Sequence, residues 1–109
     1  MKDDTLYIEQ ILDAIGKIES FVADVTFDGF TQNQEKQSAI ILQLAMIGEL
    51  SKRISEDFKK HTPLPWKEIA GFRDRAIHDY FSLDIEQVWK TIEEDIPMLK
   101  GTLQKSRAT

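Results

Sequence analysis

The sequence predicts an all-α domain in which four main helices form an up-and-down bundle. Apolar residues recur at the helical spacing of three and four in the long segments between turns. No segment has the alternation of a convincing strand, and the chain shows no internal repeat. Its 109 residues suit a single domain, which we place at residues 1–104, and we expect a frayed polar tail at 105–109.

An apolar stripe near the N-terminus indicates the first helix. Its residues share an arc of about 120° on a helical wheel, the usual width of a core-facing side. They are Ile8, Ile11, Leu12, Ile15, Ile18 and Val22. We expect this helix to end before Asp28-Gly29, a pair that is typical of turns.

A second helix is predicted over about 33–59, opened by a capping box of Thr31 and Gln34. Between Ile40 and Leu50 its apolar residues lie nearly all the way round, which indicates burial on more than one side. Two interpretations remain open. The helix is either the centre of one bundle, or it serves both its own core and a subunit interface.

Two further helices follow. Pro65 suits the first turn of a helix from Trp66 to His78. Ser82 or Asp84 can cap a fourth helix, in which Pro97 can introduce a bend. The apolar residues of this fourth helix share an arc of about 100°. They are Ile85, Val88, Trp89, Ile92, Ile96, Leu99 and Leu103.

Composition excludes several kinds of site. With 14 basic and 19 acidic residues the net charge is −5, which excludes a generally cationic nucleic-acid-binding surface but not a local basic cleft. The absence of cysteine excludes disulfides and thiolate chemistry, and we expect neither a metal nor a cofactor. The sequence has no apolar run of about 18 residues and no apparent signal peptide, so we expect a cytoplasmic protein that does not bind membranes.

Arg73 is out of place on the third helix, because it falls in the middle of an apolar arc. A buried guanidinium must be paired or must open onto a cleft. Glu49 is an available partner, and the adjacent Gly48 permits another chain segment to approach closely. In one interpretation, an ion pair between Arg73 and Glu49 fixes the register of the two helices.

His78 follows Arg73 by five residues, or about 140° on an ideal helix. The two side chains converge only if the helix ends near His78, if the arginine wraps round, or if two subunits meet. Asp74 lies four residues before His78 and could orient its imidazole, and Tyr80 lies two residues beyond. Arg73 supplies a guanidinium that can bind an anion, His78 an imidazole that can carry a proton, and Tyr80 a hydroxyl. The alternative is a solvated histidine at a helix end.

A basic rim could extend such a site, although ordinary solvated helix surface is the alternative. Its candidates are Lys52, Arg53, Lys59, Lys60 and Arg75.

Several short segments follow one another in a distinctive order. They are Ile47-Gly48-Glu49, Pro65-Trp66-Lys67-Glu68-Ile69, the run from Gly71 to Tyr80, Val88-Trp89 and Asp95-Ile96-Pro97-Met98-Leu99. In this order they resemble the HepT family, a branch of the HEPN superfamily of all-α domains. The resemblance covers residues 30–100. Its core is Arg, four residues, His, one residue and Tyr, matched here by Arg73, His78 and Tyr80. Asp74 departs from the family, which often has Asn at that position.

The resemblance implies a HEPN-like homodimer that acts as a metal-independent endoribonuclease toxin on RNA. His78 would be the general base or acid, and Arg73 would stabilise the transition state. The antitoxin would be a MntA-type minimal nucleotidyltransferase that transfers AMP to Tyr80. Asp74 and Arg75 would belong to the RNA cleft.

From the pairing and close approach argued above, we expect a structural, orienting role for Gly48 and Glu49. Two rival interpretations remain. The net charge of −5 and the carboxylate of Asp74 favour a non-catalytic partner or substrate of a minimal nucleotidyltransferase. Alternatively, the chain is a structural dimer in which Arg73 only pairs with Glu49.

Overall fold

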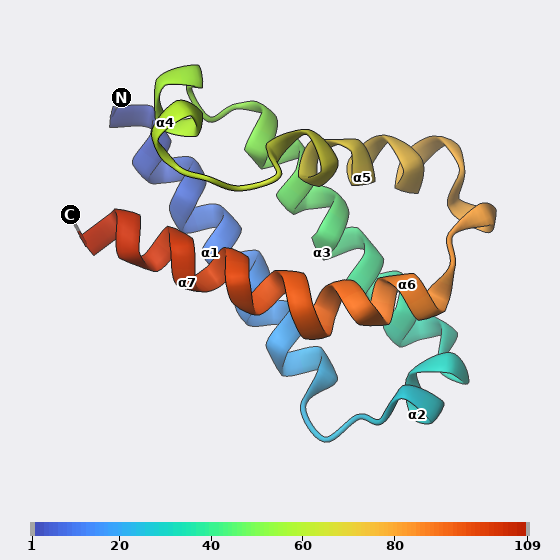
Figure 1. Cartoon of the computed structure of the whole chain (residues 1–109). Helices are drawn as coiled ribbons and strands as arrows, with labels where there is room; N and C mark the ends of the chain where they lie inside the picture. Colours follow the sequence, from blue (N-terminus) through green and yellow to red (C-terminus); the bar gives the residue numbers. More distant parts are fainter. Residues whose placement is uncertain (1, 109) are drawn as a thin grey trace.

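The computed structural model describes residues 2–108, with side chains for 4–106, and is all-helical over that range (Figure 1). The longer helices are α1 (Lys2–Val22), α3 (Gln34–Lys52), α5 (Trp66–His78) and α7 (Ile96–Ala108). The short helices are α2 (Phe27–Thr31), α4 (Glu56–His61) and α6 (Ile85–Lys90), with a 3₁₀ turn η1 (Tyr80–Ser82) and a π-helical turn η2 (Thr91–Asp95).

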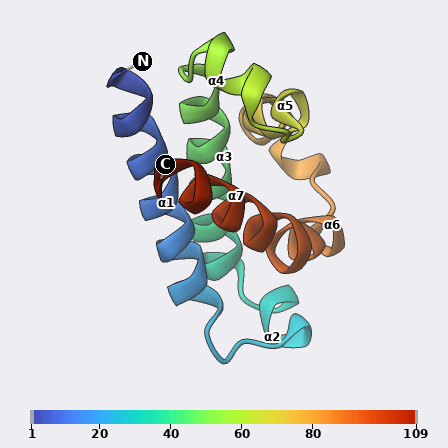
Figure 2. The same cartoon turned by 60° about the vertical axis from the view of Figure 1, so that its left-hand side comes forward.

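Helix α3 is central, because it packs against α1 on one side and α5 on another. It runs beside α1 in the opposite direction, and α6, η2 and α7 form one rod that crosses α1 (Figures 1 and 2). The core is rich in isoleucine, with Ile11, Ile15 and Ile18 of α1 fully buried against the rest. Among residues 2–108, no helix has the length and apolar character needed to cross a bilayer.

The predicted stripe of α1 faces the core, although Leu12 and Val22 are only partly buried. The helix ends at Val22, before Asp28-Gly29 as expected. That pair is not a turn, however, because it lies inside α2, whose cap is Thr26. A contact with a residue distant in sequence explains why α2 forms here. Phe30 of α2 is completely buried, and the centroid of its ring lies 5.1 Å from that of Trp89.

Helix α3 begins with a different cap from the one predicted. The side chain of Asn33 accepts a hydrogen bond of 2.9 Å from the backbone N–H of Lys36. The Thr31 hydroxyl instead donates to the carbonyl of Asp28 within α2. The prediction of a Thr31–Gln34 capping box is therefore wrong, because Thr31 closes the preceding helix.

The predicted single helix over 33–59 is also wrong, because α3 ends at Lys52 and α4 starts at Glu56. Ser55 caps α4 by accepting from the N–H of Phe58. Its own N–H and hydroxyl donate to the Asp4 carboxylate of α1, at 2.8 and 2.6 Å. Burial raises the pKa of Asp4, but the hydrogen bonds from Ser55 outweigh this and leave the pKa below its ordinary value.

Helix α5 has the predicted bounds, and Pro65 immediately precedes it. Of the two predicted caps for α6, the one used is Asp84, which accepts from the N–H of Glu86. The π-helical turn ends two residues before Pro97, whose ring removes a backbone donor from the helix. Helix α7 continues to Ala108, past the predicted boundary at 104–105, and Thr109 lies outside the described residues.

Candidate active site

The contact between α3 and α5 depends on Gly48. A Cβ atom at this position would lie 2.8 Å from the carbonyl oxygen of Ile69 and 2.9 Å from the Cβ of Arg73. Real Cβ atoms do not approach other atoms so closely, so a side chain here would push the two helices apart. The predicted close approach of another chain segment to Gly48 is confirmed, and that segment is α5. It places Arg73 of α5 opposite Glu49 of α3.

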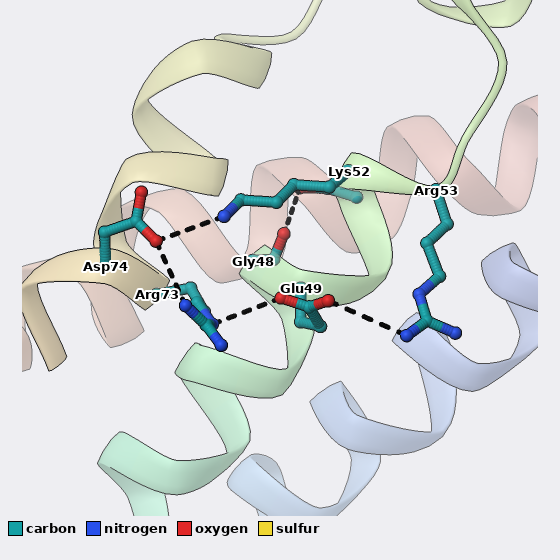
Figure 3. A network of polar contacts seen from close by, with 7 residues as sticks. Gly48, Glu49, Lys52, Arg53, Arg73 and Asp74 are labelled. Carbon is teal, nitrogen blue, oxygen red and sulfur yellow. Dashed lines mark hydrogen bonds and ion pairs between the residues drawn. The ribbon is translucent and has the colours of Figure 1, made fainter. Parts of the chain in front are cut away.

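A chain of alternating charges joins the two helices at this point (Figure 3). Arg73 Nε lies 3.1 Å from Glu49 Oε1, and Arg73 Nη1 lies 3.3 Å from Asp74 Oδ1. Lys52 Nζ donates to the same Asp74 oxygen at 3.1 Å. Arg53 Nη2 is 3.7 Å from the second oxygen of Glu49. The Arg73–Glu49 ion pair is therefore present, and two further cations belong to the same network.

The network contains three cations and two carboxylates, so it retains one positive charge. The side chain of Arg73 is 34% exposed, and its guanidinium can therefore still meet an anion from solvent. Hydrogen bonds from Lys52 and Arg73 hold the pKa of Asp74 below its usual range. A local cationic spot thus exists on a chain whose net charge is negative.

Asp74 does not orient His78 as predicted. Its carboxylate is engaged by Lys52 and Arg73 instead. Helix α5 ends at His78, and within residues 4–106 the exposed imidazole takes part in no hydrogen bond or ion pair. The structure therefore leaves His78 free to serve as a proton carrier, and it does not join His78 to Arg73 in one copy of the chain.

Tyr80 lies in η1, beyond the end of α5, and its side chain is 38% exposed. Its hydroxyl forms a hydrogen bond of 3.0 Å with that of Ser38 on α3. Sequence reasoning missed Ser38. The available signal was spacing, because Ser38 and Leu42 are four residues apart and Glu49 seven further on, which places all three on one side of a helix.

Arg75 lies apart from the charge network. Its guanidinium lies 5.3 Å from the centroid of the Phe72 ring and borders cavities on the side of α5 that faces α6. Among the other candidates for a basic rim, Lys59 lies 5.8 Å from the Trp66 ring. No group of three or more His, Asp or Glu side chains within the described part of the chain could hold a metal ion.

Comparison with known proteins identifies the family of the chain. The family model described as "Ribonuclease HepT-like" matches residues 11–106. The chain is 46% identical to "Probable ribonuclease HepT" of Thermococcus cleftensis over 93% of both chains. It is 37% identical to a protein of Caldanaerobacter subterraneus over 98% of this chain and the whole of that one. It is 35% identical to a Methanocaldococcus jannaschii protein over 94% and 95% of the two chains.

The names of these last two relatives describe an inferred RNase activity. No solved structure gives a significant match. The family match covers most of the chain and includes Gly48, Glu49 and the run from Arg73 to Tyr80. The chain therefore belongs to the HepT-like ribonuclease family.

Proposed function

We propose that this protein is a metal-independent endoribonuclease whose active site forms where two copies meet, with Arg73 and His78 as its catalytic residues. The observation that carries the proposal is the state of these two side chains. Arg73 is held in place by Glu49 yet reachable from solvent, and His78 is exposed at a helix end. Membership of the HepT-like ribonuclease family supports the choice of RNA as the substrate.

An exposed apolar surface beside these residues supports a homodimer. It consists of Leu42, Met46, Ile77 and Phe81, which are 58%, 44%, 58% and 99% exposed. Leu42 and Met46 are four residues apart on α3, and Ile77 and Phe81 flank His78 at the end of α5. Water-exposed apolar side chains grouped in this way are typical of an interaction surface. A second copy related by a twofold axis would cover this apolar surface with its own.

A dimer also accounts for the angular separation of the two catalytic residues. On one ideal helix they lie about 140° apart, and no contact joins them among residues 4–106. A twofold axis beside α5 would place Arg73 of one copy opposite His78 of the other. The two-sided character predicted for α3 fits this arrangement, because α3 packs on α1 and α5 and still exposes Leu42 and Met46.

The residue types define the reaction. The imidazole of one His78 removes the proton of a ribose 2′-hydroxyl, and the 2′-oxygen bonds to the adjacent phosphorus. The bond from phosphorus to the 5′-oxygen breaks, and that oxygen takes a proton from the imidazolium of the second copy. Arg73 stabilises the negative charge that develops on the phosphoryl oxygens. The products are a 2′,3′-cyclic phosphate and a free 5′-hydroxyl.

Regulation forms part of the proposal. The chain acts as a toxin, and a MntA-type minimal nucleotidyltransferase silences it by transferring AMP to Tyr80. The support is positional: the Tyr80 phenol is at the surface, two residues beyond His78. An adenylyl group there would add bulk and a phosphate charge beside the proposed RNA cleft, and both would exclude RNA.

The test is RNA cleavage by purified wild type in EDTA, after mass spectrometry has shown that Tyr80 is unmodified. His78→Ala and Arg73→Ala should each lose about 100-fold or more of the cleavage rate. His61→Ala is the matched control, because this second histidine lies on α4 and forms a hydrogen bond with the backbone carbonyl of Asp57 in the same helix. Cleavage by wild type with 2′,3′-cyclic ends would support the proposal. Equal cleavage by His78→Ala would refute the assigned role.

A second candidate is a non-catalytic partner or substrate of a nucleotidyltransferase. The observation that favours it is the engagement of Arg73 by two carboxylates, Glu49 and Asp74, in a chain of net charge −5. A folded, unmodified dimer that cleaves no RNA, while a minimal nucleotidyltransferase modifies Tyr80, would favour this candidate over the nuclease.

A further inference from the structure

A long groove lies on the side of α5 that faces α6, η2 and α7. Figure 1 shows these segments diverging from η1, with α3 behind them. Two cavities, of about 510 and 250 Å³, occupy the space between them. They share Phe72, Arg75, Gln87 and Thr91 in their linings and therefore form one continuous groove.

The groove is elongated and has an apolar interior. Its α5 side runs from Pro65 to Asp79, or about 21 Å at a rise of about 1.5 Å per residue. Leu44 and Ile47 of α3 lie at its floor. The apolar residues of its walls are Leu64, Ile69 and Phe72 on one side and Ile96, Met98 and Leu99 on the other. A compact small molecule would occupy only part of this length.

The rim of the groove is acidic. Carboxylates border it at four positions, which are Glu68, Asp79, Asp84 and Asp95. The one cation in the lining of the two cavities is Arg75, whose guanidinium lies over the Phe72 ring. An excess of carboxylates around an apolar floor repels nucleic acid and favours an occupant with apolar and basic side chains.

We propose that this groove docks an amphipathic α-helix of a protein partner, a helix with an apolar face flanked by Lys or Arg. An apolar stripe at i, i+3, i+4 and i+7 would fill the floor, and its basic flanks would meet the carboxylates of the rim. The length accommodates about 14 helical residues. One wall contains the π-helical turn η2, a kind of irregularity that is frequent at functional sites.

The docking groove is separate from the nuclease proposal. It involves Phe72 and Arg75 on one side of α5, whereas Arg73 faces α3. Its test therefore measures binding to the whole protein and needs no RNA cleavage. Failure of either proposal leaves the other standing.

The probe is a synthetic peptide of about 14 residues made of Leu and Lys, with leucines at i, i+3, i+4 and i+7. A peptide of the same pattern with Glu in place of Lys tests the charge requirement, and a scrambled Leu/Lys peptide tests the stripe. Calorimetry should show saturable binding of the first peptide and at least about tenfold weaker binding of the other two. Equal binding of the scrambled peptide would overturn the proposal.

Two variants tie binding to the groove. Gln87→Trp places a large ring where the two cavities meet, and it should weaken peptide binding about tenfold or more. Glu68→Lys/Asp95→Lys reverses two rim charges and should do the same. The matched control is Glu93→Lys/Glu94→Lys, which changes net charge equally outside the groove and should leave binding within about twofold.

Folding of each variant is checked by circular dichroism, and Gln87 is exposed, so its replacement disturbs no buried contact. Equal loss of binding in the two charge-reversed variants would mean that the peptide responds only to net charge, and would refute the groove. A change of oligomeric mass in Gln87→Trp, with peptide binding intact, would identify a second copy as the occupant and would also refute the proposal.

Discussion

The two sides of α5 differ sharply in how they meet the rest of the molecule. On the side of α5 that faces α3, there is no room for a methyl group at Gly48. Each charged side chain nearby pairs with one of the opposite charge. Toward α6, η2 and α7 there is a groove whose larger cavity is about 510 Å³. The helix that carries Arg73 and His78 is therefore anchored along one side only.

This contrast shows which side of α5 determines the position of Arg73. The packing of α5 on α3 holds Arg73 opposite Glu49, so that the two side chains lie within ion-pair distance. The groove side adds little to that register, since two cavities separate much of α5 from α6, η2 and α7 there. Substitutions of the same kind on the two sides should therefore have different effects, and three experiments would test this.

The largest effect is expected from alanine at two glycines. Gly48→Ala should destabilise the protein by about 1–3 kcal/mol, because its Cβ would meet the backbone of α5. Gly71→Ala, in the same pair of helices, should stabilise it by about 0.5–1 kcal/mol, because no atom lies within 4 Å of the added Cβ. Urea unfolding measures both. Equal effects would show that the close approach at Gly48 is not rigid.

A smaller effect is expected from a double-mutant cycle between Glu49 and the two arginines of α5. Glu49→Gln and Arg73→Gln should show a coupling of about 0.5–1 kcal/mol, because the two side chains form a partly exposed ion pair. Glu49→Gln and Arg75→Gln should add within about 0.3–0.5 kcal/mol, because Arg75 contacts Phe72 on the other side. Coupling of Glu49 to Arg75 would contradict the separation of the two sides.

The smallest effect concerns pH and Asp74. The pKa of this carboxyl is lower in the folded chain than its ordinary value of 3.8, since Lys52 and Arg73 donate to it. Its contribution to stability is therefore complete above the ordinary pKa and disappears as pH falls through the folded pKa. Wild type should unfold at higher urea than Asp74→Asn at about pH 6, and the difference should disappear as the pH falls through the folded pKa.

The Lys52→Gln background provides the control for this pH experiment. Without the lysine, the destabilisation caused by Asp74→Asn should be smaller at every pH above the carboxyl's pKa, because the principal donor to the carboxylate is gone. A destabilisation that is independent of pH would mean that Asp74 acts through packing and not through its charge.

Local patterns were enough to predict α1, α5 and the contact between α3 and α5. The periodicity of α1 and the position of Pro65 gave correct predictions because the deciding forces act within a few residues of sequence. Gly48 and Arg73 were also informative, because each is out of place on an apolar helix unless the other helix comes close.

The errors arose where distant residues decide the outcome. Ser55, in the break between α3 and α4, donates two hydrogen bonds to Asp4, which lies 51 residues away in the sequence. Asp74 turns to Lys52 on another helix and not to His78 on its own. The hydrogen bond between Ser38 and Tyr80 spans 42 residues. Spacing along one helix places Ser38 on the same side as Leu42 and Glu49, but it does not identify the distant partner in any of these three cases.

The hydrogen bonds from Ser55 to Asp4 have a consequence for the order of events during translation. Both residues are synthesised before any residue of α5, and domains are built from the N-terminus onward. The bend between α3 and α4 can therefore form while α5 is still absent. A bend formed at that stage would set the direction of the chain that follows it, and would direct α5 toward the Gly48 side of α3.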